Sequence, residues 1–167
     1  RLRRAHASAE TGNGPVVGVD ALAAGVEQYA KAFDARYGGF GDAPKFPRPA
    51  ELLFLLRESV RSGEMTARRM ALATLEAMAG GGIRDHVGGG FHRYSVDAEW
   101  RVPHFEKMLY DQAQLVLVYL EAGQVADASA LLDVAEDTIA YVIREMTHVD
   151  GGFYSAEDAD SLPHDTD

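Results

Sequence analysis

The tripeptide Gly-Gly-Phe occurs three times, as Gly38-Gly39-Phe40, Gly89-Gly90-Phe91 and Gly151-Gly152-Phe153. Paired glycines allow the left-handed or closely approaching backbone that ends a helix, and the Phe that follows anchors the chain in an apolar surface. Successive copies start 51 and 62 residues apart, which leaves room for two helices each time. The repeat therefore predicts an array of helix hairpins that are joined by turns of one kind.

Working outward from these turns, apolar residues recur at helical spacing in five segments. Asp20 is a candidate N-cap for the first segment, and Pro49 suits the first turn of the second. Segments that favour strands are nearly absent, so we predict an all-α fold of stacked helix hairpins with short β-like segments in the loops. The predicted helices are residues 20–36, 49–61, 65–79, 105–122 and 125–147.

Length and composition limit the possible classes of protein. A chain of 167 residues predicts one domain, with residues 1–19 as a linker or cut end and residues 20–167 as the folded part. A net charge of −10 argues against nucleic-acid binding, and no apolar run reaches the length of a membrane span. The absence of Cys excludes a disulfide framework and a thiol nucleophile. We expect a cytoplasmic protein without a cofactor.

The connection between the third and fourth predicted helices is the first candidate for a functional site. It runs for 24 residues from Gly80 to Pro103 without a clear helix, and ordered loops of this length are usually functional. Three of the six His fall between positions 86 and 104, among aromatic residues that predict a short hairpin turning at residues 97–99. Carboxylates and Arg that bind hydroxyls, combined with aromatic faces, are typical of sugar recognition.

Twelve residues follow from this interpretation as site candidates. We expect no metal, because the histidines lack the helical spacing of a metalloprotease motif. The predicted catalytic residues are His104, Asp111 and Asp158. The predicted substrate-binding residues are Asp85, His86, Arg93, Tyr94, Trp100, Glu106, Lys107, Tyr110 and Asp160.

Each candidate in or beside this loop has a structural alternative. His104, at the expected start of the fourth helix, is either a general acid or base or a first-turn residue that bonds a carbonyl. Lys107 and Asp111 lie four residues apart, on the polar helix face that also carries Tyr110, and are either site residues or a surface pair. Trp100 is more often a core anchor than a platform for a sugar ring.

The remaining loop candidates are equally open to two interpretations. The pairs Asp85-His86 and Arg93-Tyr94 either line the mouth of a site or pin the loop through buried hydrogen bonds. Asp158 and Asp160, which follow the third Gly-Gly-Phe with Glu157, either supply an acid and a base for glycoside hydrolysis or form an acidic solvated end.

Three segments are similar to a known family. They are residues 38–49, GGFGDAPKFPRP, residues 82–115, GIRDHVGGGFHRYSVDAEWRVPHFEKMLYDQAQL, and residues 151–161, GGFYSAEDADS. Together they resemble the thioredoxin domain-containing proteins that include spermatogenesis-associated protein 20. The resemblance implies an N-terminal thioredoxin-like domain followed by a helical domain similar to the six-hairpin alpha/alpha toroids of glycosidases and N-acylglucosamine 2-epimerases.

This chain matches only the helical part of that pattern. It has no Cys and no thioredoxin-like β-α pattern, and about five helices where such a toroid has twelve. We therefore expect a partial toroid, with the thioredoxin-like domain elsewhere in the parent chain. The resemblance implies a carbohydrate substrate and sugar epimerase, isomerase or glycosidase-like activity. The alternative is a non-catalytic helical scaffold that works with the thioredoxin-like domain.

Overall fold

The computed structural model describes residues 18–160, so most of the predicted linker and the last seven residues lie outside the described part. Within it, five helices occur in the order that the apolar periodicity predicts, and the all-α fold class is confirmed. The helices are α2 (Val19–Ala32), α3 (Pro49–Ser62), α4 (Met65–Gly80), α5 (Leu109–Ala126) and α6 (Ser129–Glu145).

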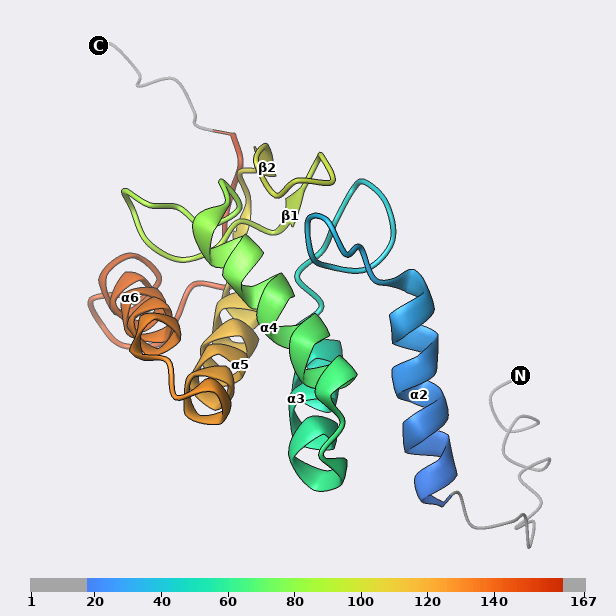
Figure 1. Ribbon diagram of the computed structural model, residues 1–167. Helices are drawn as coiled ribbons and strands as arrows, with labels where there is room; N and C mark the ends of the chain where they lie inside the picture. Colours follow the sequence, from blue (N-terminus) through green and yellow to red (C-terminus); the bar gives the residue numbers. More distant parts are fainter. Residues whose placement is uncertain (1–17, 161–167) are drawn as a thin grey trace, which may run out of the picture.

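The helices form two rows (Figure 1). Within each hairpin, α3 packs on α4 and α5 packs on α6. Between hairpins, α3 packs on α5, while α4 touches both α2 and α6. One row therefore contains α3 and α5 and the other contains α2, α4 and α6, an arrangement in which every second helix belongs to the same side.

The core lies between the two rows. α3 contributes Leu52, Leu55 and Leu56, and α4 contributes Met70 and Leu75, all of them fully buried. Burying each of these side chains stabilises the fold by about 1.5–3 kcal/mol. Local signals set the helix boundaries, as Pro49 begins α3 and a left-handed Gly63 ends it.

Several predicted helix boundaries are wrong, among them the end of the fourth predicted helix, which is Ala126 rather than residue 122. Three of the errors have a local reason. The first helix ends at Ala32 rather than residue 36, because Phe33 bridges to Phe40. It begins at Val19, so Asp20 lies in its first turn and is not the N-cap. The last helix begins at Ser129 rather than 125, because the left-handed Asp127 breaks the chain between α5 and α6.

The fourth predicted helix begins four residues late, at Leu109, because residues 103–104 and 107–108 belong to two small antiparallel sheets. In the first, β1 (Tyr94–Ser95) pairs with β2 (Pro103–His104), which confirms the predicted hairpin. In the second, β3 (Lys107–Met108) pairs with β4 (Ala156–Glu157), almost 50 residues away. His104 is thus a strand residue, and its predicted place at the start of a helix is wrong.

The three Gly-Gly-Phe turns share one backbone pattern. We name them the first turn (residues 34–40), the second turn (85–91) and the third turn (148–153). In each, the amide of the first glycine donates to the carbonyl of the residue that opens the turn, at 2.9, 3.0 and 2.9 Å. All six glycines have positive φ, which side chains with a Cβ adopt only at a cost. The predicted repeat is confirmed.

Candidate functional site

A polar pocket of about 510 Å³ opens where the second turn meets the chain that follows the third. The pairing of β3 with β4 creates it, because it brings residues 157–160 beside Lys107. Four predicted site residues, Asp85, Lys107, Asp158 and Asp160, come together here from separate parts of the sequence. The complete lining is Asp85, His92, Phe105, Lys107, Glu157, Asp158, Ala159 and Asp160.

His92 is the only imidazole in this lining, and its hydrogen bonding defines its tautomer. Its Nδ1 lies 3.1 Å from the carbonyl oxygen of Phe105, which can only accept, so Nδ1 carries the hydrogen. Burial lowers the pKa of His92, and the bond to the Phe105 carbonyl opposes this effect only in part. The Lys107 charge also lowers this pKa, while the Asp85 and Glu157 charges raise it, and the net shift is downward. The imidazole is therefore neutral near pH 7, with an Nε2 lone pair that makes no hydrogen bond to the described residues.

Lys107 and Asp85 form a nearly buried ion pair in the wall of the pocket. The Lys107 Nζ donates to Asp85 Oδ2 at 2.8 Å and to the Gly89 carbonyl at 2.9 Å, and it lies 4.3 Å from the centre of the Tyr141 ring. Burial alone would raise the pKa of Asp85, but the bonds from Lys107 and from two backbone amides hold it well below its usual value. These two residues satisfy each other and pin the second turn.

Glu157 is held in the pocket by a tyrosine on α6. The buried Tyr141 hydroxyl donates to Glu157 Oε2 at 2.5 Å, and burial followed by this bond raises the pKa of Tyr141. The neighbouring Asp158 and Asp160 are exposed, and the Asp160 amide donates to Asp158 Oδ1 at 3.2 Å. One fixed carboxylate and two accessible ones thus face the same opening.

A second polar group, outside that lining, surrounds the start of α5. Arg93 Nη1 donates to Glu106 Oε2 at 2.8 Å, and the Arg93 amide also donates to the Glu106 carbonyl at 2.8 Å. Burial raises the pKa of Asp111, Arg93 opposes this, and the Glu106 charge adds to it, so that the net pKa is about 6. Tyr110, about half exposed, lies beside them. Asp111 therefore titrates close to neutral pH.

The other predicted site residues lie apart from the pocket. The Tyr94 ring lies between Phe46 and His104, with ring centres 4.9 and 4.8 Å away, and the His104 Nδ1 is buried without a partner among the described residues. His86 is exposed and bonds the Gly81 carbonyl at 2.9 Å.

Two sequence interpretations require correction. Trp100 is fully buried and donates from Nε1 to the Tyr37 carbonyl at 3.0 Å, so it is a core anchor with no ring face left for a sugar. Lys107 does not share a helix face with Asp111. It lies in β3, before the helix begins, and its side chain points into the second turn.

The sequence interpretation missed His92 and Phe105 as site residues. Their one available signal was position, since His92 directly follows the Phe of the second turn and Phe105 precedes Glu106 by one residue. Glu157 was noted only as part of an acidic stretch. Among residues 18–160, no group of three or more His, Asp or Glu side chains has the arrangement of a metal site. In the same range, no helix is long and apolar enough to span a membrane.

Comparison with solved structures identifies the fold. A sugar epimerase from a ruminal bacterium superimposes with a TM-score of 0.73 at 15% identity, over 84% of this chain and 40% of that one. Cellobiose 2-epimerase from Bacillus thermoamylovorans superimposes with a TM-score of 0.71 at 18% identity, over 84% of this chain and 41% of that one. The two rows of helices are therefore part of an alpha/alpha toroid like that of the epimerases.

Comparison with curated sequences gives much higher identity. Spermatogenesis-associated protein 20 of Rattus norvegicus is 55% identical over 141 residues, which are 82% of this chain, and the Homo sapiens protein is 54% identical over the same length. An uncharacterized protein of Caenorhabditis elegans is 48% identical over 144 residues. No protein-family model matches the chain. The chain is homologous to a segment of spermatogenesis-associated protein 20 and spans 18% of the length of that protein.

Proposed function

We propose that the pocket between the second and third turns is a carbohydrate site at which His92 transfers a proton, in a toroid domain of the epimerase type. The observation that carries the proposal is the neutral, buried imidazole whose Nε2 has no partner among the described residues and which shares its pocket with four acidic side chains. A base of this kind works best when it is unprotonated at the operating pH.

The lining suits a sugar in two ways. Asp158 and Asp160 are accessible carboxylates that accept hydrogen bonds from hydroxyl groups, while the exposed ring of Phe105 offers an apolar surface to the C–H face of a sugar. The volume of about 510 Å³ lies within the range of small-molecule sites. The fold similarity to sugar epimerases supports this substrate class by analogy.

The proposed reaction is proton abstraction from a carbon next to a sugar carbonyl. His92 Nε2 takes the proton, a water molecule on the opposite face of the sugar returns one to the resulting enolate, which inverts that carbon, and the protonated His92 then gives its proton to solvent. Asp158 is the predicted catalytic residue that lines the pocket and is our candidate for orienting that water. The other predicted catalytic residues lie outside this lining: Asp111 belongs to the neighbouring polar group with Arg93, and His104 stacks on Tyr94.

The alternative is a non-catalytic scaffold for the thioredoxin-like domain that the resemblance implies. The observation favouring it is the duplication of the ion pair, because Lys45 and Asp34 form the same contacts in the first turn as Lys107 and Asp85 form in the second. Two of the pocket residues therefore have a purely structural counterpart.

Proton NMR in heavy water distinguishes these functions. A panel of reducing sugars and disaccharides is incubated with the full-length protein and with its His92→Gln and His104→Gln variants. We expect deuterium at the carbon next to the carbonyl with the unmodified protein and with His104→Gln, and at least a 100-fold slower exchange with His92→Gln, since general base catalysis contributes about 10²–10⁴-fold. Exchange lost only in His104→Gln would move the base to His104, and no exchange with any sugar would favour the scaffold.

A further inference from the structure

The first two turns are each covered by the second helix that follows them. A Cβ on Gly38 would meet the Ala73 carbonyl and the Thr74 Cα of α4, both at 3.0 Å. A Cβ on Gly89 would meet the Tyr141 Cβ of α6 at 3.1 Å. The first turn thus packs on α4 and the second on α6, so that each turn uses a helix of the following hairpin.

The two covering helices share a buried pattern. Ala71 and Thr74 of α4 correspond to Ala135 and Thr138 of α6, spaced three residues apart in both, and all four are buried. Each threonine hydroxyl donates to the carbonyl four residues earlier, at 2.8 Å. The Thr74 Oγ1 also accepts from the Gly39 amide at 2.8 Å, which links the helix directly to the turn that it covers. The pattern Ala-x-x-Thr is therefore a feature of the covering helices.

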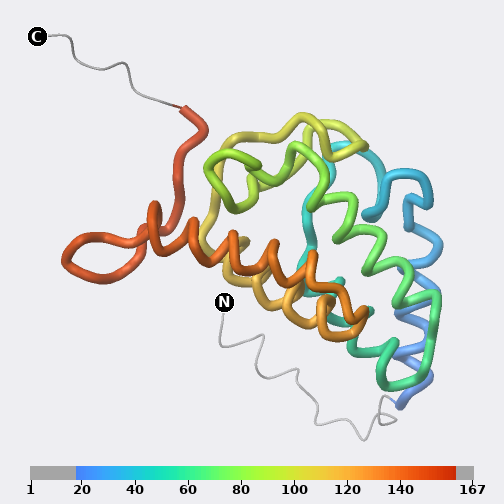
Figure 2. Tube along the Cα trace, turned by 60° about the vertical axis from the view of Figure 1, so that its left-hand side comes forward, coloured from blue at the N-terminus to red at the C-terminus, as the bar shows by residue number. Residues whose placement is uncertain are grey.

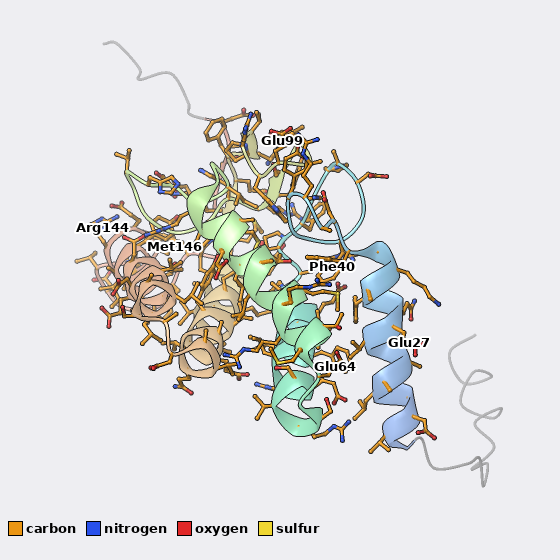
Figure 3. The ribbon with its side chains drawn as sticks, in the orientation of Figure 1. Glu27, Phe40, Glu64, Glu99, Arg144 and Met146 are labelled. Atoms are coloured by element: carbon orange, nitrogen blue, oxygen red, sulfur yellow. The ribbon has the colours of Figure 1, made fainter. Side chains whose placement is uncertain are left out.

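The third turn is one residue shorter than the other two, has the same pair of positive-φ glycines, and has no cover in the described part of the chain. A Cβ on Gly151 or Gly152 would meet nothing within 4 Å. Phe153 is 62% exposed, whereas Phe40 is 7% and Phe91 0% exposed. The turn projects from the end of α6, where Figure 3 labels Arg144 and Met146, and Figure 2 shows it as a loop that stands away from the helices.

An apolar groove of about 250 Å³ lies beside this turn. It runs between α5 and α6, and the exposed Ile139 and Ile143 continue the same apolar surface. An apolar groove continuous with an uncovered turn requires a partner that buries both. The lining of the groove is Leu109, Gln112, Ala113, Val116, Ile139, Val142, Ile143 and Phe153.

We propose that a helix of the same polypeptide, C-terminal to residue 167 and equivalent to α4 and α6, covers the third turn and the groove beside it. The repeat itself supports this occupant, because the first and second turns are both covered from the following hairpin. The length of the relatives supports it too, since the chain spans 18% of spermatogenesis-associated protein 20. The occupant carries Ala-x-x-Thr on its buried face.

Amide exchange of the full-length protein tests this proposal. The amides of Gly38, Gly89 and Gly151 each donate to the carbonyl of the residue that opens their turn, so the first two are internal references for the third. With the covering helix in place, Gly151 exchanges within about tenfold of the references. Exchange of Gly151 at the rate of an open loop, while both references are protected, would overturn the proposal.

Two matched substitutions locate the contact. Ile143 and Val60 are 65% and 67% exposed and lie in the last turns of α6 and α3. Ile143→Asp is expected to accelerate Gly151 exchange at least about tenfold, and Val60→Asp to leave it unchanged, because only Ile143 meets the covering helix. Equal effects of the two substitutions would contradict the proposal. A dimer in sedimentation that Ile143→Asp converts to monomer would identify a second copy as the occupant instead.

Discussion

In both the first and the second turn, a lysine from further along the chain bonds the Asp that opens the turn and the carbonyl of its first glycine, an arrangement that we call the cage. The two cages differ in the number of residues between the Phe of the turn and the lysine. In the first, Lys45 follows Phe40 by five residues; in the second, Lys107 follows Phe91 by sixteen. Both lysines return to the same contacts, an Asp that opens the turn and the carbonyl of its first glycine, at 2.5 and 2.8 Å in the first turn and 2.8 and 2.9 Å in the second. The extra length carries the hairpin of β1 and β2 and five of the twelve predicted site residues.

This difference separates structural from functional residues. What the two turns share serves the fold, and what only the second turn contains is available for chemistry. Asp85 and Lys107 belong to the shared cage, whereas His92, Phe105 and the pair of Arg93 with Glu106 belong to the insertion. The following substitutions test this division, from the largest expected effect to the smallest.

Removing either lysine tests the equivalence of the cages most directly. Lys45→Met and Lys107→Met each leave a half-buried carboxylate without its cation, so we expect each to lower the free energy of unfolding by about 3 kcal/mol. Urea denaturation of both variants measures the two losses. A Lys107→Met variant that stayed as stable as the unmodified protein while losing sugar exchange would assign Lys107 to the site instead.

Thr74 binds the first turn to α4, and Gln112 binds the second turn to α5, so the strengths of these two attachments can be compared. Gln112 accepts from the Phe91 amide at 2.8 Å and donates to the Phe91 carbonyl at 2.6 Å, whereas Thr74 only accepts from Gly39. Gln112→Leu leaves two buried backbone groups unpaired and is expected to cost about 2–3 kcal/mol, against about 1–2 kcal/mol for Thr74→Val. Thermal denaturation measures both, and a larger loss for Thr74→Val would refute this order.

The bond between Tyr141 and Glu157 has no counterpart in the first turn. Its loss in Tyr141→Phe is expected to cost about 1 kcal/mol and to release β4 from β3, since the hydroxyl links α6 to that strand. Exchange of the Leu109 amide, which donates to the Ser155 carbonyl at 3.0 Å, reports the release. Tyr154→Phe, at a half-exposed ring directly after the third turn, is the control and is expected to leave this amide protected.

Replacing Asp111 is expected to change the free energy of unfolding least, and the change depends on pH. Because its folded pKa of about 6 exceeds the unfolded value of about 3.9, folding binds a proton, and stability decreases as the pH rises from 4 to 6. Asp111→Asn removes this dependence and is expected to stabilise the protein by about 1 kcal/mol at pH 7, after allowance for solvent screening. Equal effects of the substitution at pH 4 and pH 7 would show that Asp111 titrates normally.

The sequence predicted the helices and the three turns because both signals are local and repeated. It could not predict the pairing of β3 with β4, since residues 107–108 and 156–157 carry no local mark of each other. That pairing explains both the late start of α5 and the position of the pocket. The role of Trp100 was decided by burial against the first turn, 63 residues away, which no periodicity reveals.

The lysines of the two cages also mark where consecutive hairpins join. Lys45, which precedes α3, pairs through its backbone with Ser95 of β1, which precedes α5, at 2.9 and 2.8 Å. Lys107 of β3 likewise pairs with Glu157 of β4, which follows the third turn. Each hairpin is thus attached mainly to its immediate successor, as in a linear repeat array. Stability therefore propagates stepwise along the chain, so damage at one cage loosens its own hairpin and the next before it reaches the rest of the domain.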